Sequence, residues 1–256
     1  MTNQLSIGLI GLGKTGSEIL SLLPDYNMTC GAICTKGSHK KEKTITSLDK
    51  MPWGAIDVFI DFSHADGLID RVHTICAHQK PLVLGTTGWD KHRQTVLDCF
   101  QKSNTPLVWG ANFSLGVWIF QSIVSSACSI LSDYPQYDIA LLEAHHKEKK
   151  DAPSGTALSL CQEIQHQLPG KKGFHSTECS PAPENGIDIA TLRVGSVPGT
   201  HQVWIEGEEE SITLTHSARN RRTFARGALT AASLLHRYRS VWHIHDLLKQ
   251  HLSLKE

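Results

Sequence analysis

The sequence lacks the features of several specialised protein classes. It has no excess charge of either sign, because 25 Lys and Arg residues balance 25 Asp and Glu residues. That balance argues against a dedicated nucleic-acid-binding protein. The seven cysteines are scattered and without a CxxC pair, which favours reduced thiols over a disulfide framework or a cysteine zinc site. The first residues, MTNQLSIGLIGLG, lack the pattern of a secretory signal, so we expect a cytoplasmic protein.

The chain also lacks a convincing membrane span. Residues 105–132 carry no charged side chain, but they include Pro106, Asn112, Gln121, two glycines and six serines, which make the stretch too polar to cross a bilayer. We interpret it as buried loop, strand and helix, and we expect neither a membrane nor a nucleic acid as a partner. Histidine is abundant instead, with 15 residues that could bind metal or transfer protons.

Apolar runs alternate with helical segments over the first 113 residues. The predicted strands cover residues 5–10, 28–34, 55–62, 81–84 and 105–109, and the predicted helices cover residues 17–23, 65–78 and 91–101. This alternation predicts an α/β fold with a Rossmann-type, doubly wound parallel sheet. We place a dinucleotide-binding domain at residues 1–113 and expect C-terminal helices within residues 222–256 to complete it.

The pattern changes after residue 113. The predicted helices there cover residues 115–131 and 154–168, and the predicted strands cover residues 137–143, 187–193, 201–206 and 210–216. The last two strands alternate polar with apolar residues, so one face of their sheet is buried against a helix or another subunit. We expect residues 114–221 to form a second α+β domain, with a mixed or antiparallel sheet, for substrate binding and oligomerisation.

A glycine loop follows the first strand and opens the first helix. Its residues are Gly11, Leu12, Gly13, Lys14, Thr15 and Gly16. Glycines at this spacing let a pyrophosphate approach the helix N-terminus, so the loop predicts dinucleotide binding rather than a plain strand-to-helix turn. The second strand ends in Cys34-Thr35-Lys36, without the carboxylate that usually binds ribose hydroxyls. NADPH or NADH is therefore the expected cofactor. Without the carboxylate a 2′-phosphate is not repelled, and Lys36 could attract one and favour NADPH, unless the lysine is simply solvated.

Two further glycine-containing segments follow predicted parallel strands. They supply the remaining candidate cofactor-binding residues, Gly85, Thr86, Thr87, Gly110, Ala111, Asn112 and Phe113. Ligands of such sheets bind at the carboxyl ends of the strands, where these segments are expected to lie. Ordinary glycine-rich turns are the alternative interpretation.

The densest polar chemistry lies between two predicted elements of the second domain. His145 and His146 leave a strand, Lys149 follows, and Gly155-Thr156 open a helix. A helix N-terminus offers free N–H groups and a positive dipole end, so it can bind a carboxylate or phosphate. Together these groups could hold an anionic substrate and donate a proton to it. A solvated loop before a capped helix remains an alternative.

Metal binding is the other alternative for this segment. Glu143, His145 and His146 carry suitable ligand atoms, but adjacent residues on a strand point to opposite faces and the HExxH spacing is missing. We therefore expect no metal.

The segment resembles the signature E-x-H-H-x-x-K-x-D-A-P-S-G-T-A of the 4-hydroxy-tetrahydrodipicolinate reductase (dihydrodipicolinate reductase) family. Five further blocks resemble that family in its own order, at residues 60–63, 85–88, 111–117, 193–201 and 215–228. The resemblance implies reduction of 4-hydroxy-tetrahydrodipicolinate (dihydrodipicolinate) by NAD(P)H to tetrahydrodipicolinate, in diaminopimelate and lysine biosynthesis. It also implies a homotetramer joined through the second-domain sheets.

The same resemblance implies roles for individual residues. His145 would donate or accept a proton, Lys149 would donate one, and His146 with Gly155-Thr156 would bind a substrate carboxylate. Residues 11–16, 85–87 and 110–113 would bind the nicotinamide nucleotide, while His201 and His216 have no assigned role.

The sequence also departs from the family at the cofactor site. Its glycine loop is one residue tighter, and Cys34 replaces the family's acidic residue after the second strand. These departures leave cofactor preference open. A nucleotide-binding regulatory protein without turnover and a related amino-acid dehydrogenase are the alternative functions.

Overall fold

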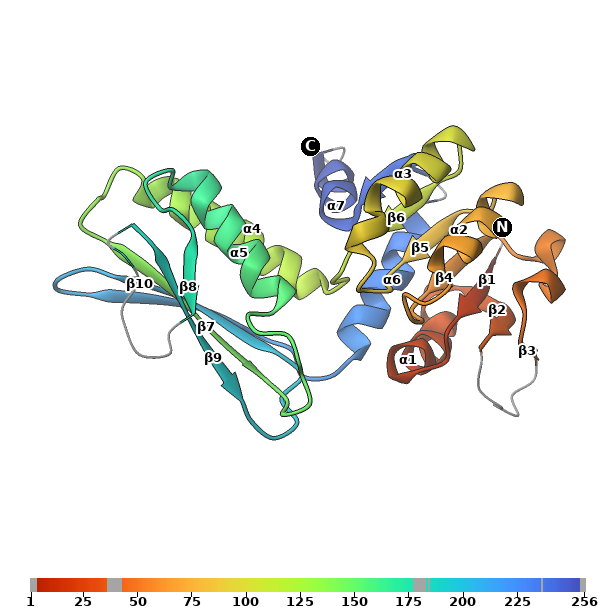
Figure 1. Ribbon diagram of the computed structural model, residues 1–256, viewed down its shortest axis with the longest axis horizontal. Coiled ribbons are helices and arrows are strands. Elements are labelled where there is room, and N and C mark those ends of the chain that lie inside the picture. Colours follow the sequence, from red (N-terminus) through yellow and green to blue (C-terminus); the bar gives the residue numbers. More distant parts are fainter. Residues whose placement is uncertain (1–3, 36–42, 177–182, 184, 236, 254–256) are drawn as a thin grey trace. The chain divides into compact units, whose positions relative to one another are not determined.

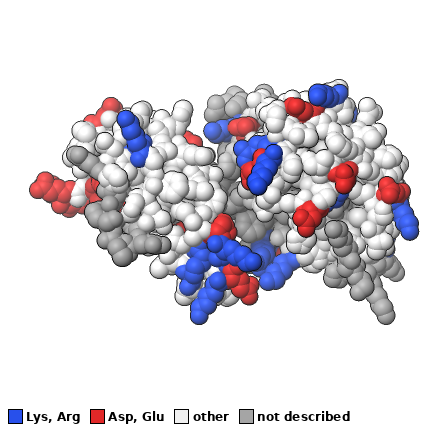
Figure 2. All heavy atoms as spheres, in the orientation of Figure 1, with Lys and Arg blue, Asp and Glu red and all other residues white. Residues whose placement is uncertain are grey.

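The computed structural model describes residues 4–35, 43–176, 183, 185–235 and 237–253. The chain divides into two compact units (Figure 1). The first unit contains Met1–Ser114 and Arg221–Glu256, and the second contains Leu115–Asn220. None of the described helices is long and apolar enough to cross a membrane. Side chains of both charge signs lie on the visible face of each unit, in agreement with the balanced composition (Figure 2).

The first unit is built on a parallel sheet of seven strands in the order β12-β6-β5-β4-β1-β2-β3. The strands are β1 (Leu5–Ile10), β2 (Met28–Cys34), β3 (Thr44–Ile45), β4 (Val58–Asp61), β5 (Leu82–Leu84), β6 (Leu107–Trp109) and β12 (Val241–His243). The helices are α1 (Lys14–Leu22), α2 (Leu68–Ala77), α3 (Arg93–Lys102), α6 (Arg222–Leu235) and α7 (Ile244–Ser253). Short 3₁₀ helices cover Leu23–Tyr26, Leu48–Lys50, Trp53–Ala55 and Asp90–His92. The prediction of a doubly wound parallel sheet is therefore confirmed.

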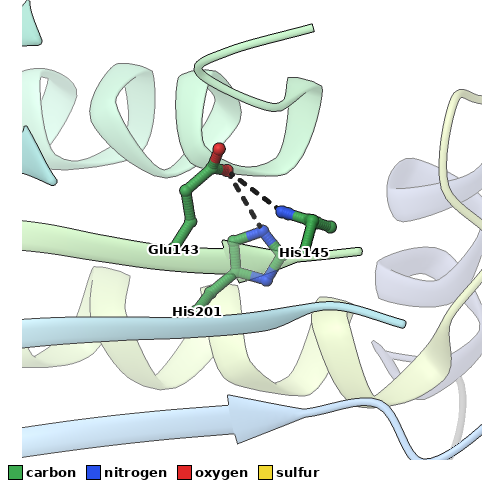
Figure 3. A group of neighbouring side chains, drawn as sticks. All are labelled: Glu143, His145 and His201. Carbon is green, nitrogen blue, oxygen red and sulfur yellow. Dashed lines mark ion pairs between the residues drawn. The ribbon is translucent and has the colours of Figure 1, made fainter. Parts of the chain in front are cut away.

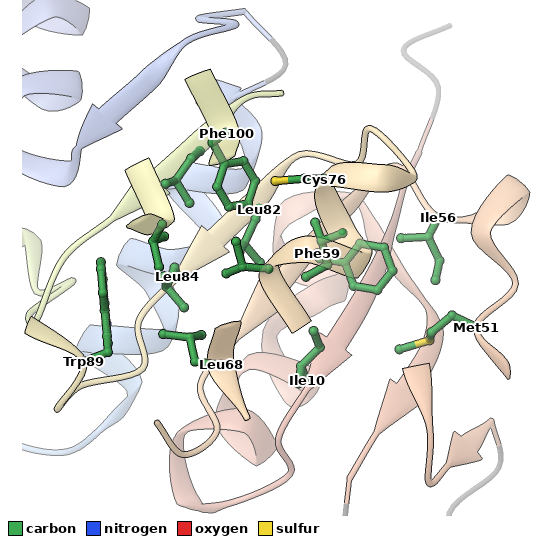
Figure 4. Close-up of a cluster of buried hydrophobic side chains, with 14 of the residues drawn as sticks. Ile10, Met51, Ile56, Phe59, Leu68, Cys76, Leu82, Leu84, Trp89 and Phe100 are labelled. Atoms are coloured by element: carbon green, nitrogen blue, oxygen red, sulfur yellow. The ribbon is translucent and has the colours of Figure 1, made fainter. Parts of the chain in front are cut away.

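The core of this unit explains why its strands are continuous apolar runs. Phe59 on β4 and Leu82 on β5 are fully buried, and they pack with Phe100 of α3 in one cluster (Figure 4). Helices α2 and α3 pack against each other over this cluster, while α1 packs against α6. A parallel sheet covered on both faces has no polar side to reveal an alternating pattern.

The second unit has a five-stranded mixed sheet in the order β11-β10-β7-β9-β8. The strands are β7 (Asp138–His145), β8 (Phe174–Ser176), β9 (Ile187–Arg193), β10 (Thr200–Glu206) and β11 (Ser211–Ser217). Strand β7 runs parallel to β9 and antiparallel to β10. Helices α4 (Leu115–Leu131) and α5 (Gly155–Gln167) bury one face of the sheet, on which Leu141 and Val203 lie opposite each other. The alternation on β10 thus correctly indicates one buried face.

Three strands fall outside the predicted elements. Strands β3, β8 and β12 have two or three residues each. A run of that length shows no periodicity, so its pairing is decided by the neighbouring strand rather than by its own sequence.

Candidate active site

The glycine loop joins β1 to α1, and each of its three glycines has a different environment. Gly11 has a φ of +90°, a backbone conformation that favours glycine. A Cβ on Gly16 would overlap the carbonyl oxygen of Gly11, so Gly16 is required for the close approach of helix and strand. Gly13 is the N-cap of α1 without a side-chain cap, and a Cβ there would meet nothing within 4 Å. The open space beside free helix N–H groups fits a pyrophosphate.

A pocket of about 780 Å³ lies beside this loop. Its lining includes Gly11, Leu12, Gly13, Cys34, Thr35, Asp49 and Arg71. The volume is typical of a small-molecule or cofactor site. Lys14, Thr15 and Gly16 form the first turn of α1 and are not part of this lining, and the predicted contact of Lys36 lies outside the described residues.

The segments after β5 and β6 lie along the same edge of the sheet as the glycine loop. The strand register aligns Asp61, Leu84 and Trp109, so the residues that follow these strands are neighbours. Gly85 donates its N–H to the carbonyl of Asp61 at 2.9 Å, and Gly110 donates to the carbonyl of Leu84 at 3.2 Å. The parallel topology therefore brings the predicted segments together, although they do not line the 780 Å³ pocket.

Several side chains of these segments are engaged within the protein. The Thr86 hydroxyl is buried and donates to Asp61 Oδ1 at 2.9 Å, and the Phe113 ring is buried against Phe62 with centroids 5.5 Å apart. Asn112 Oδ1 accepts the N–H of Ser114 at 2.9 Å. A ligand at this edge would therefore meet mainly backbone groups of these residues.

The second unit assembles a buried cluster of one carboxylate and two imidazoles. Glu143 and His145 lie two residues apart on β7 and face the same side of the sheet. His201 lies on the neighbouring strand β10, directly opposite Glu143 (Figure 3). Glu143 Oε2 is 3.7 Å from His145 Nδ1 and 3.8 Å from His201 Nε2. The exposed fraction of all three residues is 6% or less. His201 also contacts the Ser154 hydroxyl, with Nε2 and Oγ 3.1 Å apart.

Burial and hydrogen bonding set the charges in this cluster. Burial lowers the pKa of His201 to about 4, and the neighbouring His145 acts in the same direction. Burial also lowers the pKa of His145; the Glu143 carboxylate opposes this shift, whereas Lys149 and Arg193 reinforce it. For Glu143, burial acts to raise the pKa, but hydrogen bonds from Ser154 and Arg193 outweigh burial and lower it. At neutral pH the cluster therefore holds one carboxylate and two neutral imidazoles.

The loop after β7 carries the other predicted catalytic group. Lys149 Nζ donates to both carboxylate oxygens of Asp151 at 2.8 Å. The Arg193 guanidinium donates to the backbone carbonyls of Lys149 and Asp151, at 3.3 and 2.6 Å. His146 immediately follows β7, and its Nδ1 is buried without a hydrogen-bond partner among the described residues. The loop thus presents an ammonium group and an imidazole at the carboxyl end of β7.

Helix α5 begins where this loop ends. Ser154 is its N-cap, and the Ser154 hydroxyl accepts the N–H of Ala157 at 3.2 Å. A Cβ on Gly155 would meet nothing within 4 Å, so the first turn borders open space. Gly155 and Thr156 are thus placed at a helix N-terminus, which the dipole suits to an anion.

The three residues Glu143, His145 and His201 have the spacing of a possible metal group, with ligand atoms within 4.8 Å of one another. The carboxylate, however, already accepts the Ser154 N–H and the Arg193 guanidinium. An arginine on the same carboxylate would repel a metal cation, so this arrangement fits a hydrogen-bonded cluster better. Sequence reasoning left His201 without a role, although pairing the alternating strand β10 with β7 would have placed it beside Glu143.

Comparisons with known proteins agree over both units. The family model described as "Dihydrodipicolinate reductase, N-terminus" matches residues 5–113, and the model described as "Dihydrodipicolinate reductase, C-terminus" matches residues 116–248. A curated 4-hydroxy-tetrahydrodipicolinate reductase from Christiangramia forsetii is 32% identical over 246 residues, covering 95% of this chain and 98% of the relative. One from Methanocorpusculum labreanum is 37% identical over 232 residues, covering 87% and 89%.

A solved structure supports the same fold. The dipicolinate-bound dihydrodipicolinate reductase from Paenisporosarcina sp. TG-14 superposes with a TM-score of 0.78 at 21% identity, covering 95% of this chain and 99% of the other. A probable dehydrogenase from Thermotoga maritima has a TM-score of 0.65 at 10% identity, covering 95% and 92%.

Proposed function

The chain belongs to the dihydrodipicolinate reductase family, and on that premise we propose that it is a cytoplasmic NAD(P)H-dependent oxidoreductase that converts 4-hydroxy-tetrahydrodipicolinate (dihydrodipicolinate) to tetrahydrodipicolinate. This reaction belongs to diaminopimelate and lysine biosynthesis. The observation that carries the proposal is the match of both units to the family, together with the retention of His145, His146, Lys149 and Gly155-Thr156 around one end of β7.

The first unit holds the nicotinamide nucleotide in this proposal. Residues Gly11–Gly16 bind the pyrophosphate, because Gly13 leaves open space at the N-terminus of α1. Backbone groups of residues 85–87 and 110–113 border the nicotinamide end of the site. When bound, the nicotinamide supplies the hydride.

NADPH or NADH can fill this role, and we propose that the described pocket favours NADH. Asp49, Asp66 and Asp70 line the same pocket as Cys34 and Thr35 at the end of β2. The Arg71 guanidinium also lines it, but its Nε donates to the buried Asp61 carboxylate at 2.9 Å. Among the described lining residues, the carboxylates outnumber the one guanidinium, and this excess repels a 2′-phosphate more than a ribose hydroxyl.

The second unit binds and protonates the substrate. The N–H groups of Gly155 and Thr156 and the imidazole of His146 hold a substrate carboxylate, since the positive end of the α5 dipole stabilises an anion. Lys149, held as an ammonium group beside Asp151, donates the one proton that the reaction consumes together with the hydride, and the 4-hydroxyl group of the substrate leaves as water. His145 is neutral near pH 7 because burial lowers its pKa, so it can take up a proton from solvent and return it to Lys149 after each turnover.

Absorbance at the nicotinamide band, with freshly prepared substrate, tests this function. Oxidation of NADH or NADPH that depends on substrate is the expected result, and pyridine-2,6-dicarboxylate, a planar mimic of the ring, should compete with the substrate. A protein that oxidises neither cofactor is not this reductase. The site of an amino-acid dehydrogenase should not bind the planar dicarboxylate, so competition distinguishes the reductase from an amino-acid dehydrogenase.

We further propose that the enzyme is a homotetramer joined through the second-unit sheet. Trp204, with 41% of its surface exposed, and Leu192, with 51% exposed, lie on the sheet face opposite Leu141 and Val203. Exposed large apolar side chains on one face favour a protein contact. Sedimentation analysis should show four chains per particle, and Trp204→Glu should reduce that number.

A further inference from the structure

Resting on the proposed function, we propose that Glu143 and Arg193 form a buried positioning pair that fixes the two proton-handling residues, His145 and Lys149, relative to each other. Glu143 acts through His145 and the start of α5, and Arg193 acts through the loop that carries Lys149. Neither side chain needs to touch the substrate.

Glu143 connects its own strand, β7, to the start of α5 from inside the second unit. Its exposed fraction is 0%, and its two oxygens accept the backbone N–H of Ser154 at 3.0 and 3.2 Å. Its Oε2 lies 3.7 Å from His145 Nδ1, and no hydrogen-bond partner of that nitrogen is present among the described residues. The carboxylate therefore gives the buried His145 ring its nearest negative charge and anchors the first turn of α5 at the same time.

Arg193 carries the connection onward to the catalytic loop. Its Nη2 donates to Glu143 Oε1 at 3.2 Å and to the Asp151 carbonyl at 2.6 Å, and its Nε donates to the Lys149 carbonyl at 3.3 Å. Residues 146–154 form no helix or strand, so the Arg193 bonds hold the Lys149 backbone together with two other backbone hydrogen bonds, Lys149 N–H to the His146 carbonyl at 3.1 Å and Lys147 N–H to the Gly195 carbonyl at 3.3 Å. A planar guanidinium can make such divergent bonds at fixed angles, whereas an ammonium group cannot.

A pair with only a structural role would affect folding, whereas a pair with a positioning role affects kcat in the folded enzyme. Loss of positioning lowers kcat while the first unit still binds cofactor, because a small displacement of a proton donor is costly for catalysis. The charges around His145 act in both directions: Glu143 and, less strongly, Asp151 raise its pKa, whereas Lys149 and Arg193 lower it, and the neighbouring His201 ring lies 5.1 Å away. Loss of the Glu143 charge therefore removes the larger of the two effects that raise the pKa of His145. The acidic limb of the pH profile should therefore move to lower pH.

Steady-state kinetics on four variants of the full chain and one control variant tests the proposal. Glu143→Gln and Arg193→Gln should each lower kcat by about 10- to 100-fold, and Arg193→Lys should lower it less. The double variant Glu143→Gln/Arg193→Gln should lose a much smaller factor in kcat than the product of the two single losses, because both residues act in one network.

Asp138→Asn is the matched control. Asp138 is also on β7 and is paired with a lysine, Lys171, at the opposite end of the strand. The kcat of Asp138→Asn should equal that of the wild type.

The outcomes distinguish this proposal from the proposed function. Turnover by the wild type supports the function whatever the variants do, and failure of the wild type to turn over refutes the function itself. If the wild type is active but Glu143→Gln has a near-normal kcat and the acidic limb of its pH profile does not move, the positioning role is overturned. Strictly multiplicative losses in the double variant also overturn it. If Glu143→Gln does not fold, as judged by circular dichroism, Arg193→Lys decides the question, because it leaves Glu143 facing a cation.

Discussion

The ammonium group of Lys149 lies 2.8 Å from both carboxylate oxygens of Asp151, two residues further along the same loop. Burial acts to raise the pKa of Asp151, but the hydrogen bond and charge of Lys149 outweigh it and lower that pKa. Asp151 is therefore ionised over the working pH range, and it presents Lys149 as a bound cation. A protein that only senses a nucleotide has no need of a proton donor held in this way.

Replacement of Lys149 should separate proton donation from charge. Lys149→Ala should lower kcat by about 100- to 10,000-fold, the range for loss of a general acid. Lys149→Arg keeps a cation beside Asp151, but a guanidinium does not release its proton, so it should lose a similar factor. Cofactor affinity, measured by NADH fluorescence, should stay at the wild-type value in both variants because the glycine loop lies in the first unit. Full activity of Lys149→Arg would show that charge alone suffices at this position.

Gly13 and Gly16 of the glycine motif at residues 11–16 should respond differently to replacement by alanine, which adds one methyl group. Gly13→Ala should fold normally, because the added Cβ meets nothing within 4 Å, but it should weaken NADH binding by obstructing the pyrophosphate position. Gly16→Ala should destabilise the first unit by about 1–3 kcal/mol, since its Cβ would overlap the Gly11 carbonyl oxygen. Thermal melts and NADH titrations measure both effects. Unchanged NADH affinity in Gly13→Ala would place the pyrophosphate elsewhere.

Much of the fold could be predicted because its signals are local. The apolar run Leu5–Ile10 and the helix Leu115–Leu131 have the same bounds in sequence and structure. Helix α1 begins at Lys14 rather than at the predicted residue 17, because Gly13 ends the strand-to-helix turn and serves as the N-cap. Strands β3, β8 and β12 were not predicted because two or three residues show no periodicity, and the neighbouring strand decides their pairing.

The candidate site was predictable where its residues are adjacent in sequence. His145, Lys149 and Gly155 lie within eleven residues, so one motif contains them. His201 and Arg193 reach the same cluster through the pairing of β10 and β9 with β7, which a single sequence does not reveal. Asp49 and Asp70 reach the 780 Å³ pocket beside the glycine loop by tertiary folding in the same way.

The stability of the second unit should depend on pH through His201. Its folded-state pKa of about 4 lies below the ordinary value of 6.5, so the unfolded chain binds a proton at a pH where the folded chain does not. Stability should therefore fall as the pH drops from about 6.5 to about 4, by about 3 kcal/mol for this group.

Chemical denaturation at pH 7.5 and pH 4 measures the effect. The loss of unfolding free energy between these values should be about 3 kcal/mol smaller in His201→Gln than in the wild type. His73→Gln, at an exposed position on α2, is the control and should keep the wild-type difference. Equal pH dependence in His201→Gln and the wild type would assign the acid sensitivity to other groups.

Cofactor preference should depend on Asp49, which lines the pocket and accepts a hydrogen bond from the Ser47 hydroxyl at 3.1 Å. The wild type should bind NADH more tightly than NADPH, and Asp49→Asn should reduce that ratio by about 3- to 10-fold, the effect of removing one exposed charge near a 2′-phosphate. Asp49→Lys should shift the ratio further towards NADPH. Added salt should weaken the preference of the wild type for NADH over NADPH, because ions screen exposed charges.

Asp90→Asn is the control for the Asp49 variants, since Asp90 is an exposed carboxylate paired with Arg93 outside the pocket lining. A wild type that prefers NADPH, or an Asp49→Asn ratio equal to the wild-type ratio, would show that the carboxylates do not select the cofactor.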